Sequence, residues 1–318
     1  MDTSRNPDAP GTPASPIGTV MAAMATPLDD AGAIDTASVS RLVSHILEGG
    51  ADGLCPAGST GEGPLLSLAK RVYLVESVAA NAPKGTPIIP GTLSVNPDET
   101  LADIEAYSHA GATAVLVPPP FYYPLGDGAV ADFYEYLATR SPLPILLYNI
   151  PAMTKVSIAP SVVSQLAGHG AIAGMKDSSR DMEYFCAVAS AVASGVQFDL
   201  LTGSDTLLAA SLASGGKGTI AASVNLVPDL ASALYAASMS GTPDARDLQA
   251  KLAQVVFACR KPGFPAGWKA ALSLAGLCKA NMAAPLRPAT SQAKETLRAE
   301  LESVLGSKGQ LGSKGQVP

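Results

Sequence analysis

Short apolar runs alternate with amphipathic stretches of helical length along most of the chain. Gly, Pro or polar residues bound the eight runs, which cover residues 18–26, 51–58, 87–93, 114–120, 144–151, 171–179, 198–204 and 218–223. The segments between them, such as 68–82, carry apolar residues at i, i+3, i+4 and i+7, a spacing typical of helices that pack on one side. Eight strand–helix repeats predict a parallel sheet with helices outside it, closed into a (β/α)8 TIM barrel.

An open, doubly wound sheet is the alternative fold, but the GxGxxG motif that favours it is absent after the first run. Beyond residue 223 the pattern predicts three helices, over 228–259, 266–279 and 290–305. We therefore expect a barrel over 17–226 and a C-terminal three-helix extension over 227–305, which would cap the barrel or support an oligomer contact. We expect a disordered leader at 1–16, rich in Pro, Thr and Ser, and a disordered tail at 306–318, where GSKGQ repeats.

Composition excludes several classes of protein. Of 318 residues, 47% are hydrophobic and only 15% are charged, which is unlike a disordered chain. No apolar run reaches the ~18 residues of a membrane span, so we expect no membrane contact. A net charge of −6 without a basic cluster argues against nucleic acid as a partner. Four widely spaced cysteines and three unpaired histidines predict a reduced, cytoplasmic protein without a structural metal.

Lys176 is the most informative polar residue, because it follows the apolar run Ala-Ile-Ala-Gly-Met without a break. Lysine is almost never buried unless it is paired or functional. One interpretation is a lysine that snorkels or forms a salt bridge with Asp177. The other is an amine nucleophile that forms a Schiff base, since burial disfavours the ammonium form of a lysine.

Two further groups end neighbouring apolar runs. Tyr148 ends the preceding run and could transfer protons near Lys176, because adjacent strands lie about 4.8 Å apart. The segment GSTGE at 58–62 follows the second run and offers the Ser59 and Thr60 hydroxyls together with free N–H groups, which suit a carboxylate. Glu62 is expected to complement the dipole of the next helix. Trp268 and the histidines are assigned packing or helix-end roles, not chemistry.

Five motifs occur in a fixed order at the ends of predicted strands: GSTGE, FYYP (121–124), YNIPA (148–152), GMKDSS (174–179) and GSD (203–205). Over roughly residues 17–305 the chain resembles the dihydrodipicolinate synthase/N-acetylneuraminate lyase family of class I aldolases. The resemblance implies catalytic roles for Lys176, Tyr148 and Tyr122, the last often completing the relay in a neighbouring subunit. It implies substrate-binding roles for Gly58, Ser59, Thr60, Gly203, Asp205 and Ile220. It also implies pyruvate or another 2-oxo acid as substrate, a covalent Schiff base on Lys176 in place of a metal or organic cofactor, and a homotetramer.

Departures from the family pattern bear on the substrate. Met153 stands where dihydrodipicolinate synthases carry an arginine, and Asp205-Thr206 and Ala222 differ from the neuraminate lyase pattern. We therefore expect a lyase that cleaves or forms a C–C bond between pyruvate and an aldehyde, on a 2-keto-3-deoxy sugar acid. The alternatives are a dehydratase of such an acid, a dihydrodipicolinate synthase (4-hydroxy-tetrahydrodipicolinate synthase) and, from another class, a non-catalytic 2-oxo acid sensor.

Overall fold

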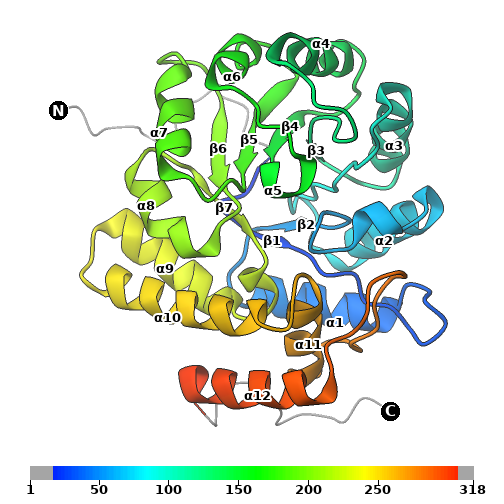
Figure 1. Cartoon of the computed structure of the whole chain (residues 1–318), viewed down its shortest axis with the longest axis vertical. Helices are drawn as coiled ribbons and strands as arrows, with labels where there is room; N and C mark the ends of the chain where they lie inside the picture. Colours follow the sequence, from blue (N-terminus) through cyan, green and yellow to red (C-terminus); the bar gives the residue numbers. More distant parts are fainter. Residues whose placement is uncertain (1–16, 307–318) are drawn as a thin grey trace.

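The computed structural model describes residues 17–306, so the expected leader (1–16) and residues 307–318 of the expected tail lie outside the described residues. Within this range the chain forms a curled, wholly parallel sheet with helices around it (Figure 1). Its strands are β1 (Val20–Ala23), β2 (Gly53–Cys55), β3 (Val115–Val117), β4 (Ile145–Asn149), β5 (Ile172–Asp177), β6 (Asp199–Thr202) and β7 (Gly218–Ala221). Their order in the sheet is β2-β1-β7-β6-β5-β4-β3. This is an α/β architecture consistent with a TIM-barrel-like fold.

The apolar run at 87–93 is not a regular strand, which corrects the expectation of eight. Pro87 and Pro90 have no N–H group, so a continuous ladder cannot form there. The segment still bonds both edge strands: Leu54 N donates to Pro87 O at 2.9 Å, and Leu116 N donates to Pro90 O at 2.9 Å. Isolated bridges at Ile88 and Gly91 belong to the same contact. The two edges of the sheet are therefore covered by one extended segment.

Alternate residues of each strand face two different apolar cores. In β4, Ile145 and Leu147 pack in the layer between sheet and helices, whereas Leu146 and Tyr148 belong to a smaller inner cluster. The same alternation separates Val20 from its neighbour Met21 in β1. Because a strand has a side-chain period of two, the positions that enter the interior of the curled sheet are set by register.

Helices that follow the strands cover the outside of the sheet (Figure 1). They are α1 (Thr36–Glu48), α2 (Leu68–Asn81), α3 (Pro97–His109), α4 (Asp127–Ala138), α6 (Pro160–Leu166), α7 (Met182–Ala191) and α8 (Leu208–Ala213). The short helix α5 (Pro151–Thr154) and the 3-10 turns η1 (Gly63–Leu65), η2 (Asp205–Leu207) and η3 (Ser223–Asn225) lie in the loops that follow strands. Local signals set several starts: Asp35 accepts from Ser38 N, and Asp181 accepts from Tyr184 N. Such N-caps satisfy backbone donors that a helix cannot pair internally.

Four helices, not three, follow β7 in the described part of the chain: α9 (Pro228–Ser240), α10 (Asp244–Arg260), α11 (Ala266–Leu274) and α12 (Ser291–Leu305). The helix expected over 228–259 is divided because Gly241 adopts a left-handed conformation with φ 65° and Pro243 follows it. α12 packs against α10 and α11 at one side of the molecule (Figure 1). No helix among residues 17–306 has the length and apolar character that a membrane crossing requires.

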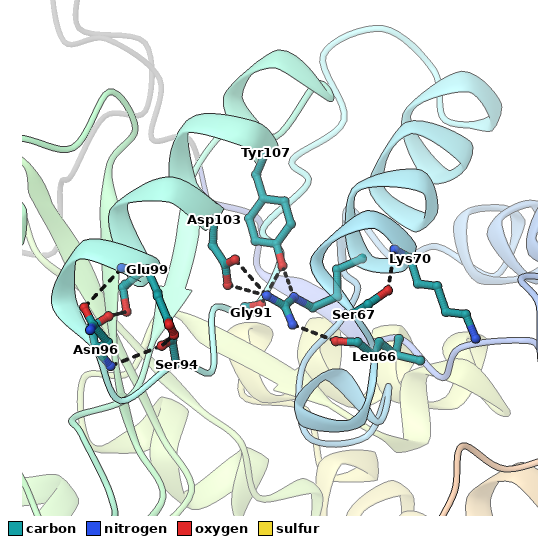
Figure 2. A network of polar contacts seen from close by, with 11 residues as sticks. Leu66, Ser67, Lys70, Gly91, Ser94, Asn96, Glu99, Asp103 and Tyr107 are labelled. Carbon is teal, nitrogen blue, oxygen red and sulfur yellow. Dashed lines mark hydrogen bonds and ion pairs between the residues drawn. The ribbon is translucent and has the colours of Figure 1, made fainter.

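Arg71 of α2 is the centre of a polar network that ties three segments together. Figure 2 labels its partners Leu66, Asp103 and Tyr107. The Arg71 guanidinium bonds both carboxylate oxygens of Asp103 at 2.7 and 2.6 Å, the Tyr107 hydroxyl at 2.9 Å and the Leu66 carbonyl at 2.7 Å. Tyr107 in turn donates to the Gly91 carbonyl at 3.2 Å. The network joins α2, α3 and the segment 87–93, so it supports the part of the sheet that lacks a regular strand.

We expect Arg71→Met to destabilise the fold by about 3–5 kcal/mol, because it leaves the nearly buried Asp103 carboxylate without its partner. The double variant Arg71→Met/Asp103→Leu removes both charges, so it should lose clearly less stability than the single variant. Urea unfolding followed by circular dichroism measures both, with the exposed Arg246→Met as control. A single variant as stable as the control would contradict this role.

Candidate active site

Strand register places Lys176 of β5 directly beside Tyr148 of β4. Both side chains are buried, with exposed fractions of 4% and 3%. The Lys176 Nζ lies 4.6 Å from the centroid of the Tyr148 ring. Met175 faces the outer core, so the strand period directs Lys176 to the inner side, where Tyr148 also lies.

Asp177 does not pair with Lys176, so the salt-bridge interpretation of this lysine is wrong. Its carboxylate accepts hydrogen bonds from Asn149 Nδ2 at 2.8 Å and from Ser179 N at 3.0 Å and Oγ at 2.8 Å. Burial raises the pKa of Asp177, and these bonds oppose that shift. Within residues 17–306 no carboxylate forms an ion pair with Lys176.

The segment 58–62 approaches the same place from the end of β2. Ser59 Oγ lies 3.4 Å from Tyr148 Oη, and either group could donate. Thr60 is buried at the wall of the cavity described below. The backbone directly after the segment is tightly packed, because a Cβ at Gly63 would meet the Ala57 carbonyl oxygen at 1.8 Å. A glycine at that position therefore allows the close backbone packing that places the two hydroxyls.

Glu62 forms a buried ion pair with Lys269 of α11, which corrects its expected role at a helix start. The two side chains are essentially inaccessible, and Glu62 Oε1 lies 2.7 Å from Lys269 Nζ. The ammonium also donates to the carbonyls of Thr26 at 2.6 Å and Asn281 at 2.8 Å. Glu62 Oε2 accepts from Ala283 N at 2.6 Å. The ion pair fixes segment 58–62 to the C-terminal helices.

A cavity of about 230 Å³ opens at the carboxyl ends of the strands, above Lys176. Its wall includes six residues predicted from the sequence: Thr60, Tyr148, Lys176, Gly203, Asp205 and Ile220. Ser59 adjoins it through Tyr148, and Gly58 is buried within the same loop. The structure therefore places six of the nine predicted site residues in one cavity wall and Ser59 next to it, with Gly58 in the same loop as Ser59.

Tyr122 is the exception. Its side chain is 77% exposed and contacts Tyr123 edge to face, with 5.0 Å between ring centroids. It is not part of the cavity wall of its own chain. A role for Tyr122 in this cavity would require a second copy of the chain.

Gly203 and Asp205 act on the shape of the cavity in different ways. A Cβ at Gly203 would lie 2.0 Å from Ser178 Oγ and 2.9 Å from Lys176 Cε, so any side chain there would displace the lysine. Asp205 is buried, and its carboxylate accepts from Ser223 N at 2.8 Å. That bond ties the end of β6 to the end of β7.

Twelve further residues line the cavity, of which only Met153 and Ala222 were linked to the substrate from the sequence, as departures from the family pattern. The twelve are Ala23, Ile150, Ala152, Met153, Ser178, Ser179, Arg180, Ser204, Ala222, Arg260, Phe264 and Trp268. Arg260 ends α10, far along the chain from any strand, so periodicity alone could not place it here. Burial lowers the pKa of Arg260, with a further contribution from the charge on Arg180. Among residues 17–306 no group of three or more His, Cys, Asp or Glu side chains could hold a metal ion.

Comparisons with known proteins agree with this geometry. The model of the dihydrodipicolinate synthetase family matches residues 16–304. A DapA-like lyase of Halobacterium salinarum, itself described as uncharacterized, is 31% identical over 92% of this chain and 96% of its own. A 4-hydroxy-tetrahydrodipicolinate synthase of Synechococcus is 33% identical over 86% of this chain and 91% of its own length. The structure of YagE from E. coli K12, described as a family member in complex with pyruvate, superposes with a TM-score of 0.86 at 26% identity, over 91% and 98% of the two chains.

We expect Gly203→Ala to lower the reactivity of the Lys176 amine, because the new methyl group would overlap Ser178 Oγ and press on Lys176 Cε. Trapping of an added 2-oxo acid on Lys176 by borohydride measures this, and the yield should fall at least about tenfold for a mispositioned nucleophile. Gly128→Ala is the matched control, since its Cβ would meet nothing within 4 Å. Equal trapping in both variants would contradict the steric role of Gly203.

We expect Lys269→Met to cost about 3–5 kcal/mol of stability, because it leaves Glu62 as an unpaired buried charge. The double variant Lys269→Met/Glu62→Gln should recover part of that loss. Chemical unfolding of both, with the exposed Lys84→Met as control, gives the measurement. If the single and double variants unfold at the same denaturant concentration as the control, the ion pair does not support the site.

Proposed function

The chain belongs to the dihydrodipicolinate synthetase family and is a carbon–carbon lyase, and on that premise we propose that it joins or splits pyruvate and an aldehyde through a Schiff base on Lys176. One observation carries the proposal. The Lys176 amine is buried in the wall of the cavity beside Tyr148, and no carboxylate among residues 17–306 forms an ion pair with it. An amine in such a place is available as a nucleophile.

In the proposed reaction, neutral Lys176 attacks the C2 carbonyl of a 2-oxo acid and gives a carbinolamine. Loss of water then forms an iminium. The C4 hydroxyl loses its proton, the C3–C4 bond breaks, and its electron pair moves through C3 to the iminium nitrogen. An aldehyde leaves, the enamine takes a proton at C3, and water hydrolyses the resulting iminium to pyruvate and free Lys176. Run in reverse, the same steps form the C–C bond.

The surrounding groups have distinct roles in this proposal. Tyr148 carries protons to and from the carbinolamine and the C4 hydroxyl, as its place beside the Lys176 amine allows. Ser59 and Thr60 hold the carboxylate of the 2-oxo acid. Gly58 belongs to the same loop, and Gly203, Asp205 and Ile220 shape the region for the rest of the substrate.

The proposal extends to assembly and location. Tyr122, exposed on its own chain, would complete the proton relay of a neighbouring copy in a homotetramer. The protein would act in the cytoplasm without an external cofactor, because the Lys176 amine supplies the electron sink. Pyruvate binding is supported by the family member YagE, which was solved in complex with pyruvate.

For the second half of the substrate we propose a 2-keto-3-deoxy sugar acid. Met153 lines the cavity with an apolar side chain where a semialdehyde-binding arginine was expected of a dihydrodipicolinate synthase. A 4-hydroxy-tetrahydrodipicolinate synthase is the second candidate, favoured by the names of curated relatives. Product analysis separates these from a dehydratase: pyruvate with an aldehyde, a cyclised condensation product, or a dehydrated 2-oxo acid.

We expect borohydride to trap pyruvate on Lys176, seen as a single modified peptide in mass spectrometry. Lys176→Arg should abolish the adduct, whereas the exposed Lys155→Arg should leave it unchanged. Tyr148→Phe should keep adduct formation at long times but slow turnover by about 10²–10⁴-fold, as loss of a general acid–base does. An adduct on another lysine, or none, would overturn the mechanism and leave the 2-oxo acid sensor.

A further inference from the structure

Two arginines line the cavity that contains Lys176, although neither was predicted from the sequence. Arg180 lies in the loop that leaves β5, and Arg260 is the last residue of α10. They reach the same cavity from segments that are 80 residues apart in the sequence. Arg180 is exposed and Arg260 is half-buried, whereas Lys176 is buried.

Neither guanidinium is committed to an acidic partner within residues 17–306. All the ion pairs in this range involve other basic residues. Asp205 is the acidic side chain of the cavity wall, and its carboxylate bonds the Ser223 amide at 2.8 Å. Arg180 and Arg260 line the same cavity; burial and then the charge on Arg180 lower the pKa of Arg260, whereas the charge on Asp205 raises it. A pair of like charges with free donors is stabilised by an anion between them.

The backbone at Arg180 is unusual. Its φ is 65°, in the left-handed region that glycine adopts at little cost and that a side chain with a Cβ adopts less readily. An arginine is therefore present at a position where the backbone alone would favour glycine. The position projects a long cationic side chain from the end of β5, directly after the strand that carries Lys176.

The cavity wall carries more basic side chains than binding of the 2-oxo acid half of the substrate requires. Its wall carries Lys176, Arg180 and Arg260 against the single carboxylate of Asp205, in a chain whose net charge is −6. In the proposed function, the Lys176 amine is covalently bound to C2 as the iminium. The segment 58–62 holds the carboxylate next to C2. Two guanidinium groups remain, and planar guanidinium forks suit carboxylate and phosphate oxygens.

We infer that the aldehyde half of the substrate carries a second anionic group, a carboxylate or a phosphate, which Arg180 and Arg260 bind at the open end of the cavity. The inference rests on the proposed function for the position of the 2-oxo group. It narrows the substrate class from a sugar acid with a neutral end to a dianionic 2-oxo acid. Arg180 and Arg260 are then the residues that determine specificity at the distal end.

The test compares ligands that differ only at the distal end. 2-Oxoadipate and 2-oxohexanoate have the same length, but only the first ends in a carboxylate, and titration calorimetry measures their binding to the full chain. Three sugar acids then separate the two sources of charge by pyruvate release: 2-keto-3-deoxygluconate, 2-keto-3-deoxyglucarate and 2-keto-3-deoxy-6-phosphogluconate. We expect the wild-type chain to prefer a charged end by roughly tenfold to a hundredfold, as hydrogen bonds to charged groups do.

Variants assign that preference to residues. Arg180→Gly, which also removes the constraint on φ, and Arg260→Gln should each lose most of the preference, measured as the ratio of the affinities for 2-oxoadipate and 2-oxohexanoate. Arg260→Lys keeps the charge, so its preference for the charged ligand should lie between those of the wild type and Arg260→Gln. Arg246→Gln is the matched control, since it removes an arginine from the same helix, α10, at an exposed position outside the cavity wall. Added KCl should weaken binding of 2-oxoadipate more than that of 2-oxohexanoate.

Each outcome separates this inference from the proposed function. Preference for the dicarboxylates or for the phosphate ester, lost in both arginine variants, supports the anion site and names its source. No preference for either charged end, or a preference equally strong in both variants, overturns it, even if borohydride traps pyruvate on Lys176. Absence of the pyruvate adduct overturns the proposed function alone, because the calorimetric preference is measured without trapping.

Discussion

A fully buried ion pair between Lys269 and Glu62 is the constraint on which the rest of the site depends. Removing two charges from water is costly, and attraction compensates only when the remaining hydrogen-bonding capacity is satisfied. Here the ammonium meets Glu62 and the carbonyls of Thr26 and Asn281, while Glu62 also accepts from Ala283 N. The pair therefore joins the ends of the first two apolar runs to the C-terminal part of the chain.

Because of this arrangement, the C-terminal helices form part of the candidate site as well as packing on the sheet. α11 supplies Lys269, which holds the loop of Ser59 and Thr60, and the adjacent Trp268, whose exposed fraction is 2%, lines the cavity. α10 contributes Arg260 at its last residue. The sheet brings the lysine and the tyrosine together, and the helices complete the wall around them.

The cavity has two chemically different ends. Lys176 and Tyr148 lie at the inner end, buried and close to the apolar interior of the curled sheet, where covalent chemistry on an amine is favoured. Arg180 is exposed and Arg260 is half-buried, so the outer end carries two cationic side chains that are more accessible than Lys176. A substrate with two anionic groups would span both ends. The division matches a reaction in which one half of the substrate becomes covalently attached and the other half departs.

The sequence by itself determined the parallel α/β class and named six residues that line the cavity. Strand period and apolar runs are local properties, so they identified Lys176, Tyr148 and the segment 58–62 without knowledge of packing. They overcounted strands at 87–93, where Pro87 and Pro90 remove donors, and they merged α9 with α10 across Gly241. Tertiary structure alone decided that Glu62 pairs with Lys269 and that Arg180 and Arg260 share one cavity. The physical reason is that these contacts join elements distant in the chain, and their pairing depends on how helices pack on the sheet, which no local pattern encodes.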